Sequence, residues 1–246
     1  ARELFTAIGA DFTIINDTPD GININVDCGS THIEQLCPRV VEGGYDLGIA
    51  FDGDADRIIA VDERGEVVDG DMLLAVFACY LISQDKLAQR TVVGTVMSNI
   101  GLLKFGEMSD VHIETTKVGD RYVMEAMRRE GAMLGGEQSG HLIFHRYSTT
   151  GDGLLAALQI LRIMREKEKP LSQLAGLLTP LPQTLINVRV EKRLPFEERP
   201  AIGAAVAQVE QDLAGRGRVL LRYSGTEALC RVMVEGEHPD KVRQYA

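Results

Sequence analysis

The sequence is poor in basic residues, lacks long apolar runs and has no closely spaced pair of cysteines. Lys and Arg number 26 against 36 Asp and Glu, which gives a formal net charge of −10 and a pI near 5.0. This shortage of positive charge disfavours a nucleic acid or an anionic membrane surface as the main partner. No apolar run reaches the roughly 18–20 residues of a membrane-spanning helix, so we expect no membrane partner.

The four cysteines, Cys28, Cys37, Cys79 and Cys230, do not have CxxC spacing. Scattered thiols of this kind indicate a reduced, cytoplasmic protein, and we assign none of them a catalytic role. The composition, 45% apolar and 25% charged, is that of a globular protein long enough for more than one domain. Both ends of the sequence fall inside expected helices, so we expect the chain to be a piece of a larger protein.

Three aspartates, Asp52, Asp54 and Asp56, stand between two short apolar runs, Leu47–Phe51 and Ile58–Val61. The bounded, β-branched runs predict two buried strands. Small residues separate the acids, so their carboxylates can turn towards one point, where they repel one another unless a cation offsets the charge. Oxygen ligands without Cys or His favour Mg²⁺, and Arg57 is suited to a phosphate brought to that metal.

Two other interpretations of this loop are weaker. A calcium-binding EF-hand needs glycine at its sixth position and helices on both sides, whereas this loop has Arg57 there and is flanked by expected strands. A plain solvated turn does not account for the buried flanks. A metal-binding loop is therefore the preferred interpretation.

From Met72 onward the pattern alternates between strands and helices. Strands are expected at 91–96 and 111–115 and helices at 72–83, 100–108 and 122–130, which favours a mostly parallel sheet covered by helices. A further strand is expected earlier, at 12–15. Lys117 follows the strand at 111–115, at the carboxyl edge of the sheet, where ligand crevices of open α/β sheets lie. An ordinary solvated lysine is the alternative.

A second loop whose residues are suited to binding or catalysis is Gly135-Gly136-Glu137-Gln138-Ser139-Gly140-His141. Its glycines allow close approach of a ligand to the backbone, and Glu137 and Ser139 are suited to the hydroxyls of a sugar. His141 can exchange a proton near neutral pH, although a single histidine before an apolar run is more often structural.

The third stretch is Arg222-Tyr223-Ser224-Gly225-Thr226-Glu227, which leads into an expected strand carrying Arg231. Small hydroxyl residues around one glycine, with a guanidinium on either side, form a phosphate-sized cradle. The lysine and glycine spacing of a Walker A loop is absent, which disfavours a nucleotide triphosphate. A hairpin turn with two surface arginines is the alternative.

Together these stretches indicate a phosphosugar held beside Mg²⁺. In order and spacing, the Asp52–Arg57, Gly136–His141 and Arg222–Glu227 loops resemble the metal, sugar and phosphate loops of the α-D-phosphohexomutase superfamily. The segment with Gln138 at its centre resembles the phosphoglucosamine mutase branch, and the phosphomannomutase/phosphoglucomutase branch is the alternative. A non-catalytic module that binds metal and phosphosugar also stays open.

The resemblance implies an α/β fold class, with two phosphohexomutase-type α/β domains of mixed sheets covered by helices and a smaller α+β C-terminal domain with an antiparallel sheet. We expect the family's second domain at 1–71, its third at 72–182 and its fourth at 183–246. The family's first domain, which carries a phosphoserine nucleophile, has no counterpart in the sequence. The fragment alone is therefore expected to be inactive, and a homodimer stays open.

The resemblance also implies roles for the residues of the three loops. Asp52, Asp54 and Asp56 are expected to bind Mg²⁺, and Arg57 to steady the transferring phosphoryl group. Glu137 and Ser139 are expected to hold sugar hydroxyls, and Lys117 and His141 are the two candidates for proton transfer. The residues expected to hold the non-reacting phosphate are Arg222, Ser224, Gly225, Thr226 and Arg231.

Overall fold

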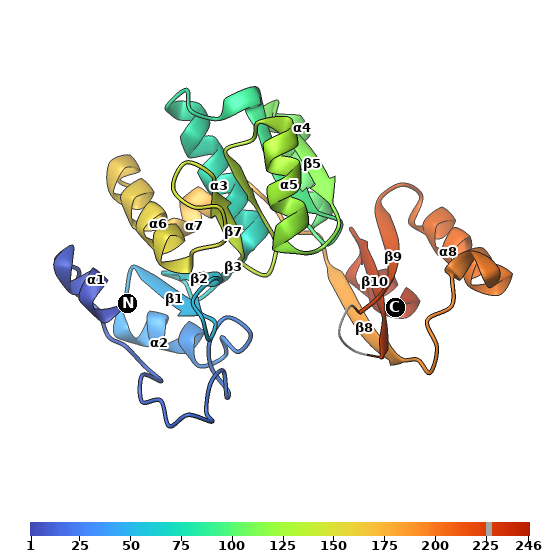
Figure 1. Ribbon diagram of the computed structural model, residues 1–246, viewed down its shortest axis with the longest axis horizontal. Helices are drawn as coiled ribbons and strands as arrows, with labels where there is room; N and C mark the ends of the chain where they lie inside the picture. The colour runs from blue at the N-terminus through green and yellow to red at the C-terminus, as the bar shows by residue number, and fades with distance from the viewer. Residues whose placement is uncertain (225–227) are drawn as a thin grey trace. The chain divides into compact units, whose positions relative to one another are not determined.

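The computed structural model describes residues 1–224 and 228–246, apart from the side chain of Glu197. The chain forms two compact units, one of residues 1–98 and 102–178 and one of residues 99–101 and 179–246 (Figure 1). None of the helices in the described residues is both long and apolar enough to cross a membrane.

The first unit begins with two short helices and a three-stranded sheet. These elements are α1 (Arg2–Ala7), α2 (Leu36–Gly43), β1 (Leu47–Phe51), β2 (Ile58–Asp62) and β3 (Val67–Val68). The strands lie in the order β1-β2-β3, and both pairs are antiparallel. The strand expected at 12–15 is wrong, since those residues have no regular structure; Phe12 packs on Phe5 instead, with ring centroids 5.8 Å apart.

A four-stranded sheet in the order β5-β4-β6-β7 forms the second part of this unit. Its strands are β4 (Thr91–Thr95), β5 (His112–Thr116), β6 (Leu134–Gly136) and β7 (Leu142–Phe144). Strand β4 runs parallel to β5 and β6, whereas β7 is antiparallel to β6. The reversal has a local cause, because only the tight turn at 137–141 joins β6 to β7.

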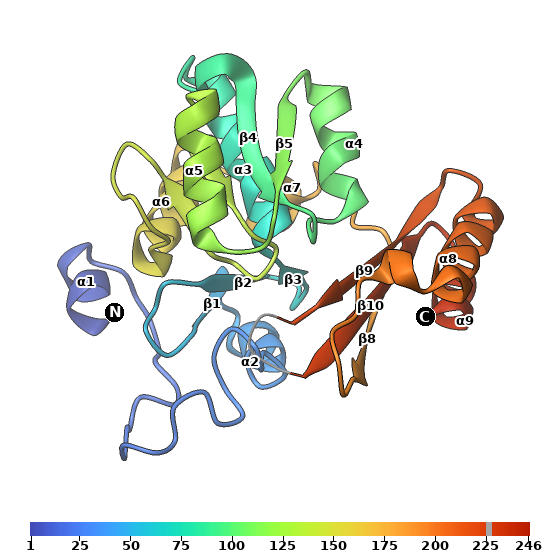
Figure 2. The ribbon, with the colours of Figure 1, turned by 45° about the vertical axis from the view of Figure 1, so that its right-hand side comes forward.

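Helices cover both faces of this sheet (Figures 1 and 2). The helices of this part are α3 (Gly70–Ser83), α4 (Ile100–Ser109), α5 (Asp120–Glu130), α6 (Gly153–Lys167) and α7 (Leu171–Ala175), with a 3-10 turn, η1 (Ala88–Arg90), before β4. Helices α6 and α7 pack on α3. Side chains alternate along the strands. Val92 and Leu142 join the core under α3, and their neighbours Val93 and Ile143 join the core under α5.

The second unit is built on an antiparallel sheet in the order β8-β10-β9. Its elements are β8 (Gln183–Arg189), η2 (Phe196–Glu198), α8 (Pro200–Leu213), β9 (Gly217–Tyr223), β10 (Leu229–Gly236) and α9 (Pro239–Tyr245). A small core of Leu213, Val234 and Val242 joins the two helices to the sheet. The fully buried carboxylate of Glu235 accepts hydrogen bonds from Arg218 (2.8 Å) and from the amide of Ile100 (2.8 Å).

The expected α/β class with a final antiparallel α+β part is confirmed. The four-stranded sheet is mixed, as expected. The three-stranded sheet is antiparallel, because consecutive strands joined by short connections pair in opposite directions. The three domain ranges 1–71, 72–182 and 183–246 stay a prediction.

Candidate metal and phosphosugar site

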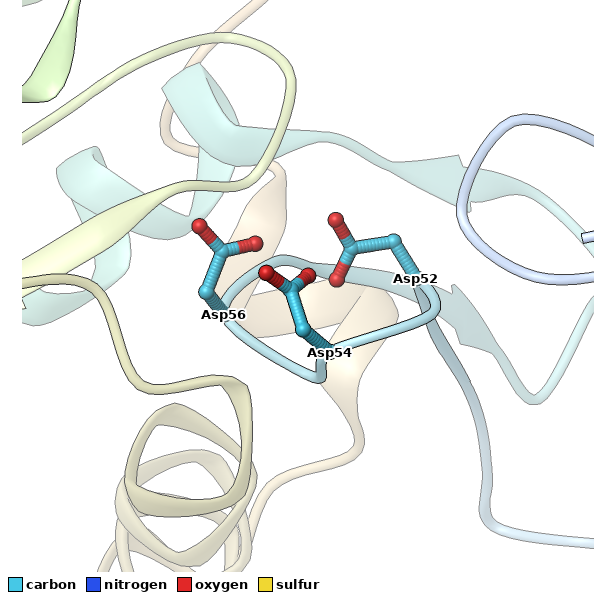
Figure 3. Close-up of side chains that lie close together, drawn as sticks. All are labelled: Asp52, Asp54 and Asp56. Carbon is cyan, nitrogen blue, oxygen red and sulfur yellow. The ribbon is translucent and has the colours of Figure 1, made fainter. Parts of the chain in front are cut away.

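The three aspartates lie in the connection between β1 and β2. One carboxylate oxygen from each of Asp52, Asp54 and Asp56 can be chosen so that all three lie within 4.8 Å of one another. Figure 3 shows the three carboxylates turned towards a common point. The turn is held by the amide of Arg57, which donates to Oδ1 of Asp52 at 3.1 Å, and by the amide of Ala55, which donates to the Asp52 carbonyl.

The electrostatics of this cluster fit a cation. Burial raises the pKa of Asp56, the neighbouring carboxylates of Asp52 and Asp54 also raise it, and His141 lowers it. Oδ1 of Asp56 is buried and has no hydrogen-bond partner among the described residues. A buried carboxylate oxygen among like charges is costly unless a positive group approaches it. The donor set, oxygen atoms only, suits a hard divalent cation such as Mg²⁺.

His141 connects the aspartate loop to the loop after β6. Its side chain is nearly buried, with Nδ1 3.0 Å from Oδ2 of Asp56, and Nε2 accepts the Gly151 amide at 3.0 Å. A backbone amide can only donate, so Nε2 must be an acceptor and the ring proton is on Nδ1, donated to Asp56. Both ring nitrogens are therefore engaged inside the protein.

Arg57 leaves the aspartate loop beside its acids. Its Nε lies 3.5 Å from Oδ2 of Asp52 and 3.8 Å from Oδ1 of Asp56, and 44% of the side chain is exposed. The backbone of Arg57 forms an antiparallel bridge with His141, and the next amide, of Ile58, donates to the Gly140 carbonyl. The guanidinium is thus anchored near the carboxylates and open to a ligand at its outer end.

The start of α6 packs directly against the aspartate loop. Asp152 caps the helix by accepting the Leu155 amide at 2.9 Å, and the Gly153 amide donates to the Ala55 carbonyl at 2.9 Å. A Cβ on Gly153 would lie 2.7 Å from the Arg57 carbonyl, and one on Gly151 would lie 2.6 Å from the His141 ring. The Gly151-Asp152-Gly153 segment therefore shapes the site, a role that its sequence alone, typical of helix entry, does not reveal.

The loop between β6 and β7 carries Glu137 and Ser139, two of the predicted sugar-binding residues. Oε1 of Glu137 accepts the amide of Gly119 at 3.1 Å, so Glu137 ties this loop to the segment after β5. Ser139, two residues on, is exposed. The Glu137 carboxylate is thereby oriented by the protein and keeps acceptor capacity for a ligand.

Gln138 holds the same loop to the beginning of α3. Its Nε2 donates to Oδ2 of Asp69 at 3.3 Å, and its carbonyl accepts the Gly70 amide at 3.0 Å. Asp69 also caps α3 through the Met72 amide. A Cβ on Gly70 would lie 2.0 Å from the Glu137 carbonyl, so only glycine allows this approach. The Gln138–Asp69 contact is a positioning element that sequence patterns did not suggest.

Lys117 follows β5 and is exposed. It lines an open cavity of about 460 Å³ together with Thr115, Thr116 and Tyr122. Within the described part of the chain its ammonium forms no ion pair. The hydrogen bond between Gly119 and Glu137 fixes the segment that carries Lys117 to the loop of Ser139 and His141.

The predicted phosphate residues belong to the second unit. Arg222 on β9 and Arg231 on β10 are directly opposite in the antiparallel register, so their side chains share one face of the sheet. The amide of Ser224, a buried residue, donates to the Leu229 carbonyl at 2.9 Å. Gly225 and Thr226 lie outside the described residues. Two half-buried guanidinium groups on one face of the sheet offer the forked donors that suit a phosphate.

The structure thus joins several predicted residues by direct contacts and leaves others separate. Asp52, Asp56, Arg57 and His141 form one contact network, and Glu137 joins it through the loop that it shares with His141. Arg222, Ser224 and Arg231 belong to the other unit. The residues that sequence reasoning missed are Asp69, Gln138, Gly119 and Gly151, all of which act through contacts with distant segments.

Comparison with known proteins identifies the family. Residues 69–181 match the family model described as phosphoglucomutase/phosphomannomutase, alpha/beta/alpha domain III. Residues 185–246 match the model described as the phosphoglucomutase/phosphomannomutase C-terminal domain. The structure is similar to that of Aspergillus fumigatus N-acetylphosphoglucosamine mutase, solved in complex with GlcNAc-6P and magnesium, with a TM-score of 0.79 at 23% identity, over 99% of this chain and 61% of that one. This similarity shows the shared fold.

Two curated relatives, both named phosphoglucosamine mutase, are much more similar in sequence. The protein from Desulfovibrio desulfuricans is 69% identical over 239 residues and the one from Nitratidesulfovibrio vulgaris 56%, covering 97% of this chain in each case. The alignments cover 53% of each relative, so the chain spans about half the length of the curated relatives it matches. With the two domain matches, the fold and these relatives in agreement, the chain belongs to the phosphoglucomutase/phosphomannomutase family of the α-D-phosphohexomutase superfamily.

Proposed function

We propose that this chain supplies the metal-binding and phosphosugar-binding parts of a magnesium-dependent phosphoglucosamine mutase, which interconverts glucosamine 6-phosphate and glucosamine 1-phosphate. The single observation that carries the proposal is the convergence of three aspartates on one point, tied through His141 to the loop of Glu137 and Ser139. Relatives at 50–69% identity that are named phosphoglucosamine mutase support this choice within the family.

The proposed reaction moves a phosphoryl group twice. An enzyme phosphoserine transfers its group to the free hydroxyl of the sugar phosphate, which gives a 1,6-bisphosphate and a free serine. After the bisphosphate turns round, the serine takes the other phosphoryl group, leaving the isomeric monophosphate. The product would feed UDP-N-acetylglucosamine and cell-wall precursor synthesis. Catalysis of this kind depends on positioning and charge neutralisation.

Asp52, Asp54 and Asp56 would hold Mg²⁺, which when bound supplies positive charge against the oxygens of the transferring phosphoryl group. Arg57 would add a second positive group from the same loop, since its guanidinium is anchored beside Asp52 and still half exposed. His141 would keep Asp56 turned towards the metal by donating its Nδ1 proton, which makes it a positioning residue.

Proton transfer is assigned to Lys117. His141 is disfavoured as a proton carrier, because one ring nitrogen donates to Asp56 and the other accepts the Gly151 amide. Lys117 is exposed and unpaired among the described residues, and Glu137 holds its segment through Gly119. In this proposal the neutral amine of Lys117 accepts the proton of the attacking sugar hydroxyl, and the resulting ammonium gives a proton to the leaving serine oxygen. The second transfer moves the proton the opposite way, from the serine hydroxyl to the sugar oxygen.

The sugar and the second phosphate would be held by the remaining predicted residues. The carboxylate of Glu137 and the hydroxyl of exposed Ser139 are suited to sugar hydroxyls. Arg222 and Arg231, which share one face of β9 and β10, are suited to the non-reacting phosphate. Ser224, Gly225 and Thr226 are proposed to add hydrogen bonds to the same group.

Two experiments test the proposal. Isothermal titration of the 246-residue chain with Mg²⁺ should show binding, and Asp54→Asn should remove it. A protein with the full length of the relatives should convert glucosamine phosphates, whereas this chain alone should not, because no segment of it resembles the family's phosphoserine loop. Absence of Mg²⁺ binding in the presence of glucosamine 6-phosphate would reject the metal assignment.

The alternative within the family is a phosphomannomutase or phosphoglucomutase, which the names of the matched domains leave open. Rates with glucosamine, glucose and mannose phosphates on the full-length protein distinguish the two. Preference for a mannose phosphate would overturn the glucosamine assignment. Absence of turnover with all three, together with binding of metal and phosphosugar, would leave a non-catalytic binding module.

A further inference from the structure

A second cavity, of about 140 Å³, lies between α3, α6 and the segment that follows β7. It contains none of the metal, sugar or phosphate residues discussed above. An engineered apolar cavity of about 150 Å³ is large enough to bind benzene. The space is therefore suited to a ligand with a single six-membered ring.

Aromatic side chains form much of its wall. Phe77 and Phe144 are almost fully buried and meet edge to face, with ring centroids 4.8 Å apart. Tyr80 is also buried, and its hydroxyl donates to Glu166 at 2.6 Å, which fixes the ring. Tyr147 lines the cavity too but is 55% exposed. Ring edges and faces in this arrangement favour a planar aromatic ligand over an aliphatic chain of the same size.

The charged groups that line the cavity are all positive. Lys86, Arg146 and Arg162 contribute to the lining, and no acidic residue in the described part of the chain does. Arg162 is neutralised by Glu166, whose Oε1 lies 2.7 Å from its Nε. Lys86 and Arg146, in contrast, form no ion pair with any described residue. The guanidinium of Arg146 lies over the Tyr147 ring, 5.9 Å from its centroid. In a chain of net charge −10, two cations without a carboxylate partner among the described residues, beside an apolar space, suit an anionic ligand.

We propose that this cavity binds a single-ring aromatic carboxylate. The ring lies against Phe77 and Phe144, and the carboxylate faces Arg146, whose planar guanidinium can donate two parallel hydrogen bonds. Lys86 adds a second positive charge. The amide of Gln159, which lines the cavity and forms no side-chain hydrogen bond with another described residue, adds a further donor. This site is independent of the proposed mutase activity.

The test uses 4-fluorobenzoate as the probe and the line width of its ¹⁹F resonance as the readout, with the 246-residue protein as titrant. The uncharged isostere 4-fluorobenzamide is the matched ligand control. We expect 4-fluorobenzoate to bind with a Kd of about 1 mM or lower, the range open to so small a ligand. The amide should bind at least about tenfold more weakly, since it lacks the charge that Arg146 and Lys86 recognise.

Four variants locate the binding. Arg146→Gln and Lys86→Gln should each weaken 4-fluorobenzoate binding about fivefold, and the double variant more than either. Arg165→Gln, at an exposed position of α6 that does not line the cavity, should leave 4-fluorobenzoate binding unchanged. Equal affinity for the two probes, unchanged binding in the double variant, or no binding to the unaltered protein each overturns the proposal. All substituted residues are exposed, so the variants keep the fold.

Discussion

Two antiparallel strand pairs of this chain each gather side chains of like charge. The first cluster is acidic and the second is basic. The β1–β2 connection gathers Asp52, Asp54 and Asp56, and β9 and β10 place Arg222 opposite Arg231. The acids are held by contacts from distant segments, through His141 and Gly153. The arginines are placed by the register of a regular ladder. The clustered acids repel one another unless a cation offsets their charge, and the paired guanidinium groups suit an anion, so each cluster is a candidate ligand site.

The difference between them lies in how the position is specified. A ladder register follows from local strand pairing, so the arginines can be placed opposite each other by two strands alone. The aspartate loop has an irregular backbone and needs outside support. The acidic cluster should therefore be sensitive to changes in residues that are not ligands, whereas the arginine pair should be sensitive chiefly to loss of the arginines themselves.

The largest effect is expected for Asp54→Asn. Removal of one carboxylate should weaken Mg²⁺ binding by at least about a hundredfold. This loss exceeds the one that is typical when a residue that only contacts a metal ligand is changed. The same change relieves repulsion, so the Tm of the metal-free protein should rise while its gain on adding Mg²⁺ disappears. Calorimetric titration and thermal unfolding measure the two effects. Glu107→Gln, an exposed acid on α4, is the control and should alter neither. Full Mg²⁺ affinity in Asp54→Asn contradicts the metal site.

Arg222→Ala should have the next largest effect, a loss of about tenfold in affinity for glucosamine 6-phosphate, as expected when a charge-assisted hydrogen bond is removed. Arg231→Ala should behave alike, because the two side chains share one face. Equilibrium binding of the sugar phosphate and of inorganic phosphate provides the measurement. Lys192→Gln, at an exposed cation of the second unit, serves as control. If neither arginine variant differs from that control, the paired arginines do not bind phosphate.

Much of the fold could be predicted from sequence, because it rests on local patterns. The apolar runs on either side of the aspartates are strands β1 and β2, and the alternation after Met72 gives the helices and strands of the mixed sheet. The strand expected at 12–15 failed because no neighbouring strand pairs with it, and Phe12 packs on Phe5 instead. Periodicity indicates which side chains prefer burial, but a strand also needs a partner.

The candidate site was harder to predict from the sequence, because the contacts that support it join segments far apart in the chain. His141 and Asp56 are 85 residues apart, and Gln138 and Asp69 are 69 apart. The residue types of the three loops suggested metal, sugar and phosphate, yet nothing in them shows that both His141 nitrogens are engaged or that Glu137 accepts the Gly119 amide. The assignment of the individual site residues stays a prediction for the experiments described here.

Variants of His141 test whether the acidic cluster depends on a residue that is not itself a proposed metal ligand. His141→Asn keeps an amide donor near the position of Nδ1, so Mg²⁺ affinity should fall less than about threefold. His141→Gln places its donor further out and should lower the affinity about tenfold, the lower end of the effect of residues behind metal ligands. Titration with Mg²⁺ compares the variants. In the full-length protein the Asn variant should keep most of its turnover. Loss of turnover in both variants, with Mg²⁺ binding intact in the Asn variant, would mean that His141 carries the proton.

The smallest effect is expected for a change of Asp69, which holds the loop of Glu137 by accepting a hydrogen bond from Gln138. Burial raises the pKa of Asp69 above its ordinary value of 3.8 and outweighs the hydrogen bonds from Met72 and Gln138. A carboxyl whose pKa is raised in the folded state stabilises the protein below the unfolded value, and this contribution is lost as pH rises through the folded value. Asn caps helices as well as Asp does and carries no charge. Asp69→Asn should therefore match the unaltered protein in stability below about pH 4 and exceed it by up to about 1 kcal/mol at pH 7 to 8, measured by urea unfolding at both pH values. A variant that is less stable at pH 7 to 8 would show that the charge of Asp69 is needed to hold Gln138 and α3 together.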